Sequence, residues 1–239
     1  MTDDWMVIER NPAPLRSQIV EKLRTAIIEG VYSPGERLIE RALCEALLIS
    51  RPSLREAIRQ LETEGLIENV PNRGPVVRTL SPQEVKALCD LCILVEGLCA
   101  RYFAEHGLDS EIDAFEAALL AFEKSFGTGD VLAIRRAKYH YYEAFVVGTH
   151  SEVLQTTLRR LNARLSQCWA SSLRQPDRVP EAIGEMRVIV QAIRRRDADA
   201  ACAASTLYAQ HFSAFVNRVL VDGPVAKPKS RRPRAVATR

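Results

Sequence analysis

Apolar side chains recur at helical spacing near the start of the chain. In residues 15–30 they follow a spacing of three and four, and Gly30 provides a stop. A Pro-Gly turn separates this segment from a second short apolar stripe at residues 39–49. Residues 50–66 divide into an apolar face and a charged face when they are placed on a helix. The pattern therefore predicts three short helices.

The third of these helices has one face for packing and one for contact. The apolar face consists of Leu54, Ala57, Ile58 and Leu61. Arg55 and Arg59 lie on the opposite face, and Arg51 stands at the helix start beside Pro52. Outward arginines are most often only solubilising, so the surrounding elements must decide what these three do.

A small hairpin is predicted after the third helix. Two apolar runs, 66–70 and 76–80, flank Pro-Asn-Arg-Gly-Pro, which places Arg73 and Gly74 at the tip. Three helices and a hairpin form a winged helix-turn-helix, in which the third helix enters the major groove of DNA. We therefore expect residues 1–80 to be a DNA-binding domain.

Residues 81–221 are predicted to form an all-helical bundle. Ser81 is the expected cap of its first helix, and Glu84 reaches back to that cap. Glycines and polar breaks divide the segment into six helices, at about 81–106, 110–126, 130–147, 151–173, 180–195 and 197–220. The predicted fold is mainly α, with a winged helix followed by a bundle.

Charge adds little to this picture. The chain has a net charge of +3, but residues 1–80 carry 11 basic and 12 acidic side chains, and residues 81–221 carry 16 and 17. The excess lies in the Pro-rich segment 222–239, which we expect to be a disordered tail that either attracts phosphates nonspecifically or has no specific role. Any argument for DNA binding must rest on where the charges are placed.

The cellular setting follows from what the sequence lacks. It has no apolar run long enough to span a membrane, and its acidic N-terminus is unlike a signal peptide. The six cysteines lie within apolar helical patterns, which indicates reduced thiols. We expect a soluble cytoplasmic protein with no membrane association.

A contiguous stretch carries a family resemblance. The sequence GVYSPGERLIERALCEALLISRPSLREAIRQLETEGLI resembles the DNA-binding domain of the GntR superfamily of bacterial transcription regulators. The resemblance implies DNA contacts for Arg41, Arg51, Arg55 and the region of Gly74, where Arg73 is also expected to contact DNA. Guanidinium groups at the start of a recognition helix can bind guanine O6 and N7, which agrees with that role for Arg51 and Arg55.

Four further positions have less specific predicted roles. Arg41 is better placed for a phosphate than for a base, and the hairpin backbone at Gly74 can approach the duplex closely. Ser53 either caps its helix or binds a phosphate. Arg59 is either a solvated surface group or a phosphate contact.

The second domain resembles the FCD effector domain of the FadR-like branch, most clearly in AIRRRDADAACAASTLYAQH and AKYHYYEAF. That resemblance implies one Asp and three His around a divalent metal that binds a small organic acid. Here Met186 and Arg136 stand where a His and the Asp are expected, and only His140 and His211 remain. A thioether and a guanidinium cannot replace such ligands, so we expect no metal site and no cofactor.

The expected effector pocket centres on the 130–147 helix. Leu132, Ala133, Arg136, Tyr139, His140, Glu143 and Val147 are predicted to share its inward face. A buried guanidinium needs an anion. Arg136 therefore either pairs with Glu143, swings to the surface, or holds the carboxylate of an effector directly. The expected effector residues are Arg136, His140, Glu143, Met186 and His211.

Together these patterns predict a transcription regulator, not an enzyme. It should bind a double-stranded inverted-repeat operator as a homodimer and respond to a small, acidic effector. The alternative is a helical hydrolase or lyase that uses His140, Glu143 and His211, but this leaves the first domain unexplained.

Overall fold

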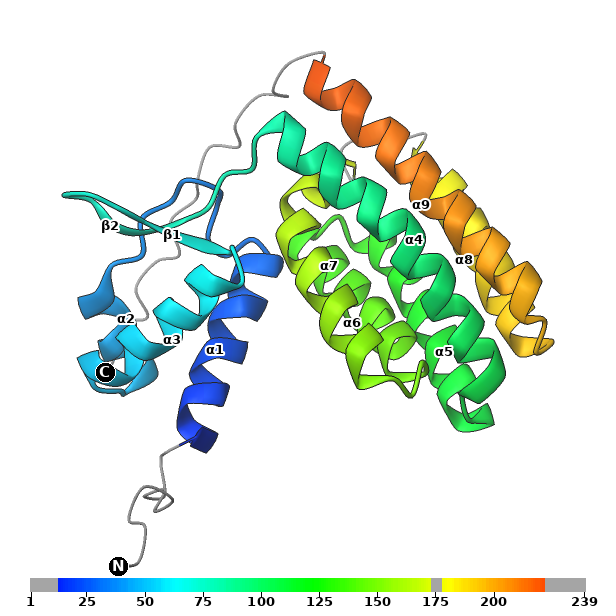
Figure 1. Cartoon of the computed structure of the whole chain (residues 1–239), viewed down its shortest axis with the longest axis horizontal. Coiled ribbons are helices and arrows are strands. Elements are labelled where there is room, and N and C mark those ends of the chain that lie inside the picture. Colours follow the sequence, from blue (N-terminus) through cyan, green and yellow to red (C-terminus); the bar gives the residue numbers. More distant parts are fainter. Residues whose placement is uncertain (1–12, 173–177, 222–239) are drawn as a thin grey trace, which may run out of the picture.

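Three helices and a hairpin form the N-terminal unit of the computed structural model, which describes residues 13–172 and 178–221. The helices are α1 (Ala13–Ile28), α2 (Glu40–Leu47) and α3 (Arg51–Thr63), and the antiparallel strands are β1 (Ile67–Val70) and β2 (Gly74–Val77). Figure 1 shows the hairpin projecting from one end of this unit. The predicted winged helix-turn-helix is confirmed. The predicted basic tail, 222–239, lies outside the described residues.

The apolar face predicted for α3 is the face that packs inward. Its members Leu54, Ala57, Ile58 and Leu61 are all buried. They pack against Ile19, Leu23 and Ile27 of α1 in one hydrophobic cluster. The helix starts where the Ser50 side chain accepts a hydrogen bond from the Ser53 backbone, and this cap corrects the predicted capping role of Ser53.

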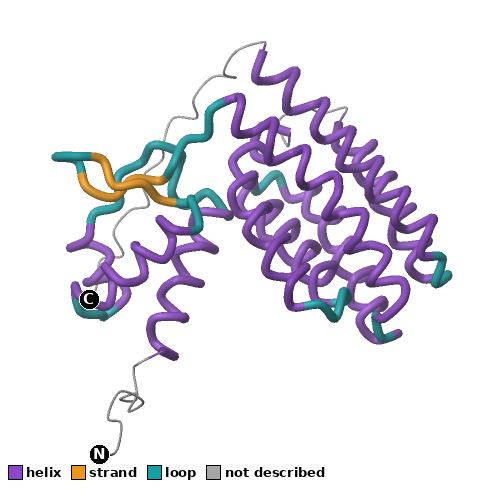
Figure 2. Tube along the Cα trace, in the orientation of Figure 1, coloured by secondary structure: helices purple, strands orange, loops and turns teal. Residues whose placement is uncertain are grey.

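Six helices form the second unit, as predicted. They are α4 (Pro82–His106), α5 (Asp109–Ser125), α6 (Val131–Val147), α7 (Glu152–Ser172), α8 (Arg178–Arg194) and α9 (Ala198–Val221). The capping box of Ser81 and Glu84 that starts α4 is present. Figure 2 shows short loops between α4 and α5, between α6 and α7 and between α8 and α9. None of the described helices has the length and apolar character needed to cross a membrane.

The longest helix, α4, packs closely along α9 (Figure 1). Gly97 makes this approach possible, because a Cβ atom there would lie 2.3 Å from Thr206 Oγ1 and 3.3 Å from Cys202 Sγ. The opposite side of α4 contributes apolar side chains to the aromatic core of the bundle, which includes Phe103, Phe115 and Phe145.

The orientation predicted for α6 is wrong. Its buried residues are Ile134, Lys138, Tyr141, Tyr142, Phe145 and Val146. Arg136 and His140, which were predicted to face inward, are exposed. The predicted face leaves out Lys138, whose long stem packs in the core and whose charged end has polar partners there.

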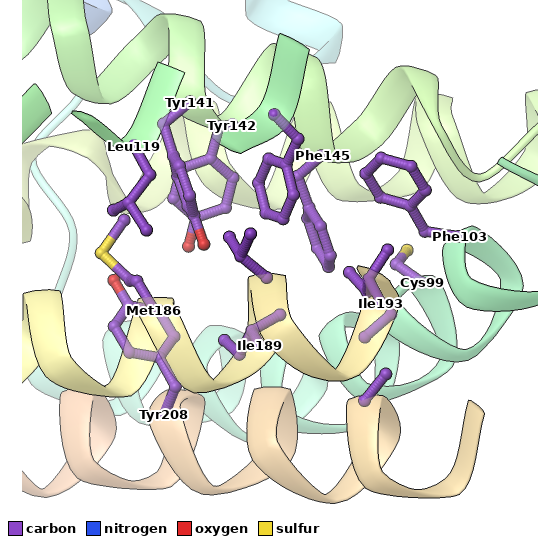
Figure 3. Packing of buried hydrophobic residues seen from close by; sticks show 14 of the residues in the cluster. Cys99, Phe103, Leu119, Tyr141, Tyr142, Phe145, Met186, Ile189, Ile193 and Tyr208 are labelled. Atoms are coloured by element: carbon purple, nitrogen blue, oxygen red, sulfur yellow. The ribbon is translucent and has the colours of Figure 1, made fainter. Parts of the chain in front are cut away.

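Those partners form a polar cluster in the middle of the bundle. Lys138 Nζ donates to the Tyr208 hydroxyl at 2.6 Å and lies 3.7 Å from Met186 Sδ. It also lies 5.0 to 5.3 Å from the centres of four aromatic rings, those of Phe122, Tyr141, Tyr142 and Tyr208. Figure 3 shows the hydroxyl ends of Tyr141 and Tyr142 pointing toward Met186 and Tyr208.

A buried carboxyl group completes this cluster. Tyr142 donates to Glu96 Oε1 at 2.8 Å, and Glu96 is 5% exposed. Burial raises the pKa of Glu96 to about 7, although the Tyr142 hydrogen bond and the Lys138 charge act in the opposite direction. Desolvation therefore outweighs both favourable contacts.

Glu96→Gln should reduce the pH dependence of stability. The folded protein keeps a proton on Glu96 between its ordinary pKa of 4.5 and about 7, while the unfolded chain has released it. The free energy of unfolding should therefore fall as pH rises through this window and level off above it. The amide cannot ionise and still accepts the Tyr142 hydrogen bond. Denaturant unfolding on both sides of the window tests this, and an undiminished pH dependence in the variant would contradict it.

Candidate functional site

The outer face of α3 presents three exposed arginines, Arg51, Arg55 and Arg59. Arg55 Nε lies 3.2 Å from Glu40 Oε2, and Arg59 Nη1 lies 2.8 Å from Glu56 Oε1. Exposed ion pairs of this kind contribute only about 0 to 1 kcal/mol. A DNA phosphate or base edge can therefore replace either carboxylate at small cost.

Three of the predicted contact residues meet in a shallow hollow of about 330 Å³ beside the start of α3. Arg41, Arg51 and Gly74 line it, together with Arg37 from the loop before α2. Sequence reasoning missed Arg37, although it is the arginine of the Pro-Gly-Glu-Arg-Leu turn. No local sequence pattern indicates this position, because it depends on a backbone β-bridge between Arg37 and Val76 of β2, which is distant in the sequence.

The hairpin differs in detail from its prediction. Its turn is formed by residues 71–73, and Gly74 is the first residue of β2. Gly74 has a φ of +79° and no atom within 4 Å of the place where a Cβ would stand, so its backbone is open to a partner. The Arg73 guanidinium folds back and donates to the Gly35 carbonyl at 2.9 Å. Arg73 therefore supports the base of the wing.

A cavity of about 510 Å³ lies where the two units meet. Residues from α1, the C-terminal end of α3, α6 and α7 line it. This volume falls within the range of small-molecule sites. The cationic lining residues are Arg24, Arg135, Lys138, Arg159 and Arg160, and the acidic ones are Glu21, Glu64 and Glu143.

Ion pairs join several of these side chains. Arg24 binds both carboxylate oxygens of Glu64, at 2.7 Å from Nη2 to Oε1 and 3.0 Å from Nε to Oε2. Arg159 Nε lies 3.0 Å from Glu143 Oε2. Arg135 Nη2 donates to the Ile28 carbonyl at the end of α1 at 2.7 Å. Cations outnumber carboxylates in this lining, so the cavity favours an anion.

The predicted effector residues do not form one group. Glu143 lines the cavity, and Met186 is fully buried beside Lys138. Arg136 lies outside the cavity and pairs at 3.0 Å with Glu29, in the turn after α1. Of the expected alternatives for Arg136, the surface position is the one found. The correction has a physical reason, because α6 turns its Lys138 side inward and leaves Arg136 beside α1.

The two predicted histidines are also separate from the cavity lining. His211 Nδ1 lies 2.5 Å from Glu185 Oε1, and His140 is exposed with its ring 5.8 Å from that of Tyr139. No hydrogen bond or ring contact in the described residues joins His140, Glu143 and His211. The arrangement gives no support to the hydrolase or lyase alternative.

The centre of the bundle does not fit the divalent metal that an FCD domain implies. The side chains that meet there are Lys138, Tyr142, Met186 and Tyr208, with the single carboxyl group of Glu96 hydrogen-bonded to Tyr142 among the described residues. An ammonium group repels a metal ion, and a thioether and phenols are poor ligands for a hard or borderline one. Within the described residues, no three His, Cys, Asp or Glu side chains form a metal-binding group.

Comparisons with known proteins agree with this architecture. The family model for bacterial regulatory proteins of the gntR family matches residues 15–77, and the FCD domain model matches residues 87–211. The chain is 30% identical over 210 residues to the galactonate operon transcriptional repressor of Escherichia coli (strain K12), covering 77% of this chain and 89% of that protein.

Two further comparisons cover most of the chain. It is 26% identical over 215 residues to the HTH-type transcriptional regulator YdhC of Bacillus subtilis (strain 168), covering 89% of this chain and 95% of that protein. The structure of E. coli McbR/YncC shares the fold, with a TM-score of 0.76 and 17% identity over 86% of this chain and 98% of that one. The chain therefore belongs to the GntR family of bacterial transcription regulators, in the FadR-like subfamily whose C-terminal domain is an FCD domain.

Proposed function

We propose that this DNA-binding transcription regulator binds an inverted-repeat operator as a homodimer, and that a small acidic effector controls its operator affinity. In this proposal residues 1–80 bind DNA, and residues 81–221 bind the effector and form the dimer. The observation that carries the effector part is the cavity of ligand size with more cationic than acidic side chains. The name of the related galactonate operon repressor refers to a sugar acid, which supports the same ligand class.

The arginines of α3 divide into two proposed roles. Arg51 and Arg55 stand in the first turns of the helix and read base edges in the major groove. Arg41, Arg59 and the first turn at Ser53 contact phosphates, which position the protein without reading sequence. Gly74 brings the backbone of the wing close to the duplex.

An exposed apolar stripe on α4 supports the homodimer. Leu91, Leu94 and Leu98 are 51%, 72% and 41% exposed, and their spacing of three and four places them on one face of the helix. A cluster of large exposed apolar side chains often marks an interaction surface. A dimer also brings two recognition helices to the operator, which multiplies the sequence discrimination of each.

Arg51→Ala and Arg55→Ala should each weaken operator binding by about 1 to 3 kcal/mol and relax the preference at one base pair in each half-site. Arg59→Ala is the matched control and should weaken binding to all sequences alike, because a phosphate contact carries no sequence information. Gel shifts with operator DNA from the neighbourhood of the coding gene, and with unrelated DNA, measure both effects. Equal losses on all DNA for Arg51→Ala and Arg55→Ala would contradict base readout.

Leu94→Glu should convert the dimer into a monomer, because a carboxylate in the centre of the apolar stripe cannot be desolvated without a partner. Val153→Glu on α7 is the control, since Val153 is 75% exposed and lies outside this stripe. Light scattering at micromolar concentration distinguishes the two states. A wild type that is monomeric with and without operator would overturn the dimer proposal.

Sugar acids and citrate should change operator affinity without added metal. Titration of D-galactonate, D-gluconate and citrate into the protein with labelled operator, followed by fluorescence anisotropy, tests this. EDTA should leave the response unchanged, because Lys138 and its neighbours do not suit a divalent ion. Dependence on a divalent metal would contradict the proposed mode of binding, and no response to any of the three acids would contradict the proposed effector class.

A further inference from the structure

Both polar atoms of one side chain in the cavity lining are unsatisfied. Asn162 Nδ2 and Oδ1 are buried and have no hydrogen-bond partner among the residues that the structure describes. Leaving a buried donor or acceptor unpaired costs about 1 to 3 kcal/mol. A ligand that offers both an acceptor and a donor removes this cost, and a hydroxy acid offers a carboxylate oxygen and a hydroxyl group.

Arg160 belongs to the same lining and precedes Asn162 by two residues on α7. It has no ion-pair partner among the described residues, whereas Arg24 and Arg159 in this lining are paired with Glu64 and Glu143. A guanidinium group in that state is a ready bidentate partner for a carboxylate. The cavity therefore combines an available cation with an unsatisfied amide.

The opposite wall of the cavity belongs to the DNA-binding unit. Arg24 of α1 holds Glu64, the residue that ends α3, and Gln60 Nε2 donates to the same carboxylate at 3.2 Å. The side chain of Glu64 is 8% exposed and that of Arg24 is 19% exposed. These contacts link the cavity to the C-terminal end of the helix that carries Arg51 and Arg55, and an anion bound beside Arg24 would compete with Glu64 for it.

We propose that the cavity between the two units is a hydroxy-acid site, in which Arg160 and Asn162 hold the ligand and the Arg24–Glu64 pair transmits its presence to α3. This inference rests on the proposed function for the ligand class. It adds that the ligand touches the DNA-binding unit directly. It also places recognition at the junction of the two units, in a cavity whose bundle side includes Lys138 and Tyr142.

A tethered charge tests this site without knowledge of the natural effector. Thr156 lines the cavity, while its neighbour Thr157 does not and serves as a matched control. Each is changed to Cys in the full-length protein and treated with 2-sulfonatoethyl methanethiosulfonate, which adds an anion, or with the trimethylammonium-ethyl reagent, which adds a cation of similar size. Treated wild type accounts for the six natural cysteines.

The sulfonate at Thr156→Cys should raise the melting temperature and change operator affinity by about fivefold or more, a typical allosteric coupling. The trimethylammonium group there should not, and neither reagent should act at Thr157→Cys. Equal effects of the two reagents at position 156 would mean that the cavity has no preference for anions, and this result would overturn the inference. Equal effects at positions 156 and 157 would overturn it as well.

Two variants separate this inference from the proposed function. Asn162→Leu removes the unsatisfied amide, so it should raise the melting temperature of the free protein and still abolish the anisotropy response to D-galactonate, D-gluconate and citrate. Arg160→Ala should also abolish that response, whereas Arg195→Ala, at an exposed arginine outside the lining, should keep it.

The outcomes distinguish the two proposals. If Asn162→Leu and Arg160→Ala still change their operator affinity when the acids are added, the proposed function is supported and the proposed site is wrong. If only the tethered sulfonate acts at position 156 and the wild type does not respond to any of the acids, the cavity is an anion site and the proposed effector class is wrong.

Discussion

The packing of α7 against α1 is the contact on which the arrangement of the two units depends. Ala163 of α7 is 2% exposed and belongs to the hydrophobic cluster that α1 and α3 form, so the core of the winged helix is completed by a residue of the bundle. Removing apolar surface from water is the main stabilising effect in folding. The DNA-binding unit therefore gains this stability only when it lies against α7 in the observed position, where Ala163 is buried.

Polar contacts from α6 fix the same position more closely. Arg135 caps the C-terminal end of α1 through the Ile28 carbonyl, Arg136 pairs with Glu29, and the Tyr139 hydroxyl donates to Glu21 at 3.2 Å. Gly30 has a φ of +77°, a backbone conformation that other residues rarely adopt, and a Cβ atom there would displace the Arg135 guanidinium from its place beside α1. A movement of α6 or α7 must therefore move α1, and with it α3, which shares the hydrophobic cluster of α1.

The interior of the bundle gives this regulator a different electrostatic centre from the one its family resemblance implies. A lysine held by a tyrosine hydroxyl, a thioether and aromatic rings supplies a positive charge that cannot dissociate as a metal ion can. The carboxyl group of Glu96 lies near this charge and is hydrogen-bonded by Tyr142. Buried polar groups of this kind are stable only when their partners are all in place, so the cluster ties α4, α6, α8 and α9 to one another.

The sequence alone determined the elements of the fold and the arginine-rich outer face of α3. A helical period, a capping box at Ser81 and a turn at Pro-Gly are local properties, and local geometry decides them. Tertiary structure decided which face of α6 is buried and which charges meet. The partners of Lys138 lie 48 and 70 residues away, and that of Arg136 lies 107 residues away. Whether a charged side chain is buried depends on such distant partners, which offset its loss of water, and no local pattern contains them.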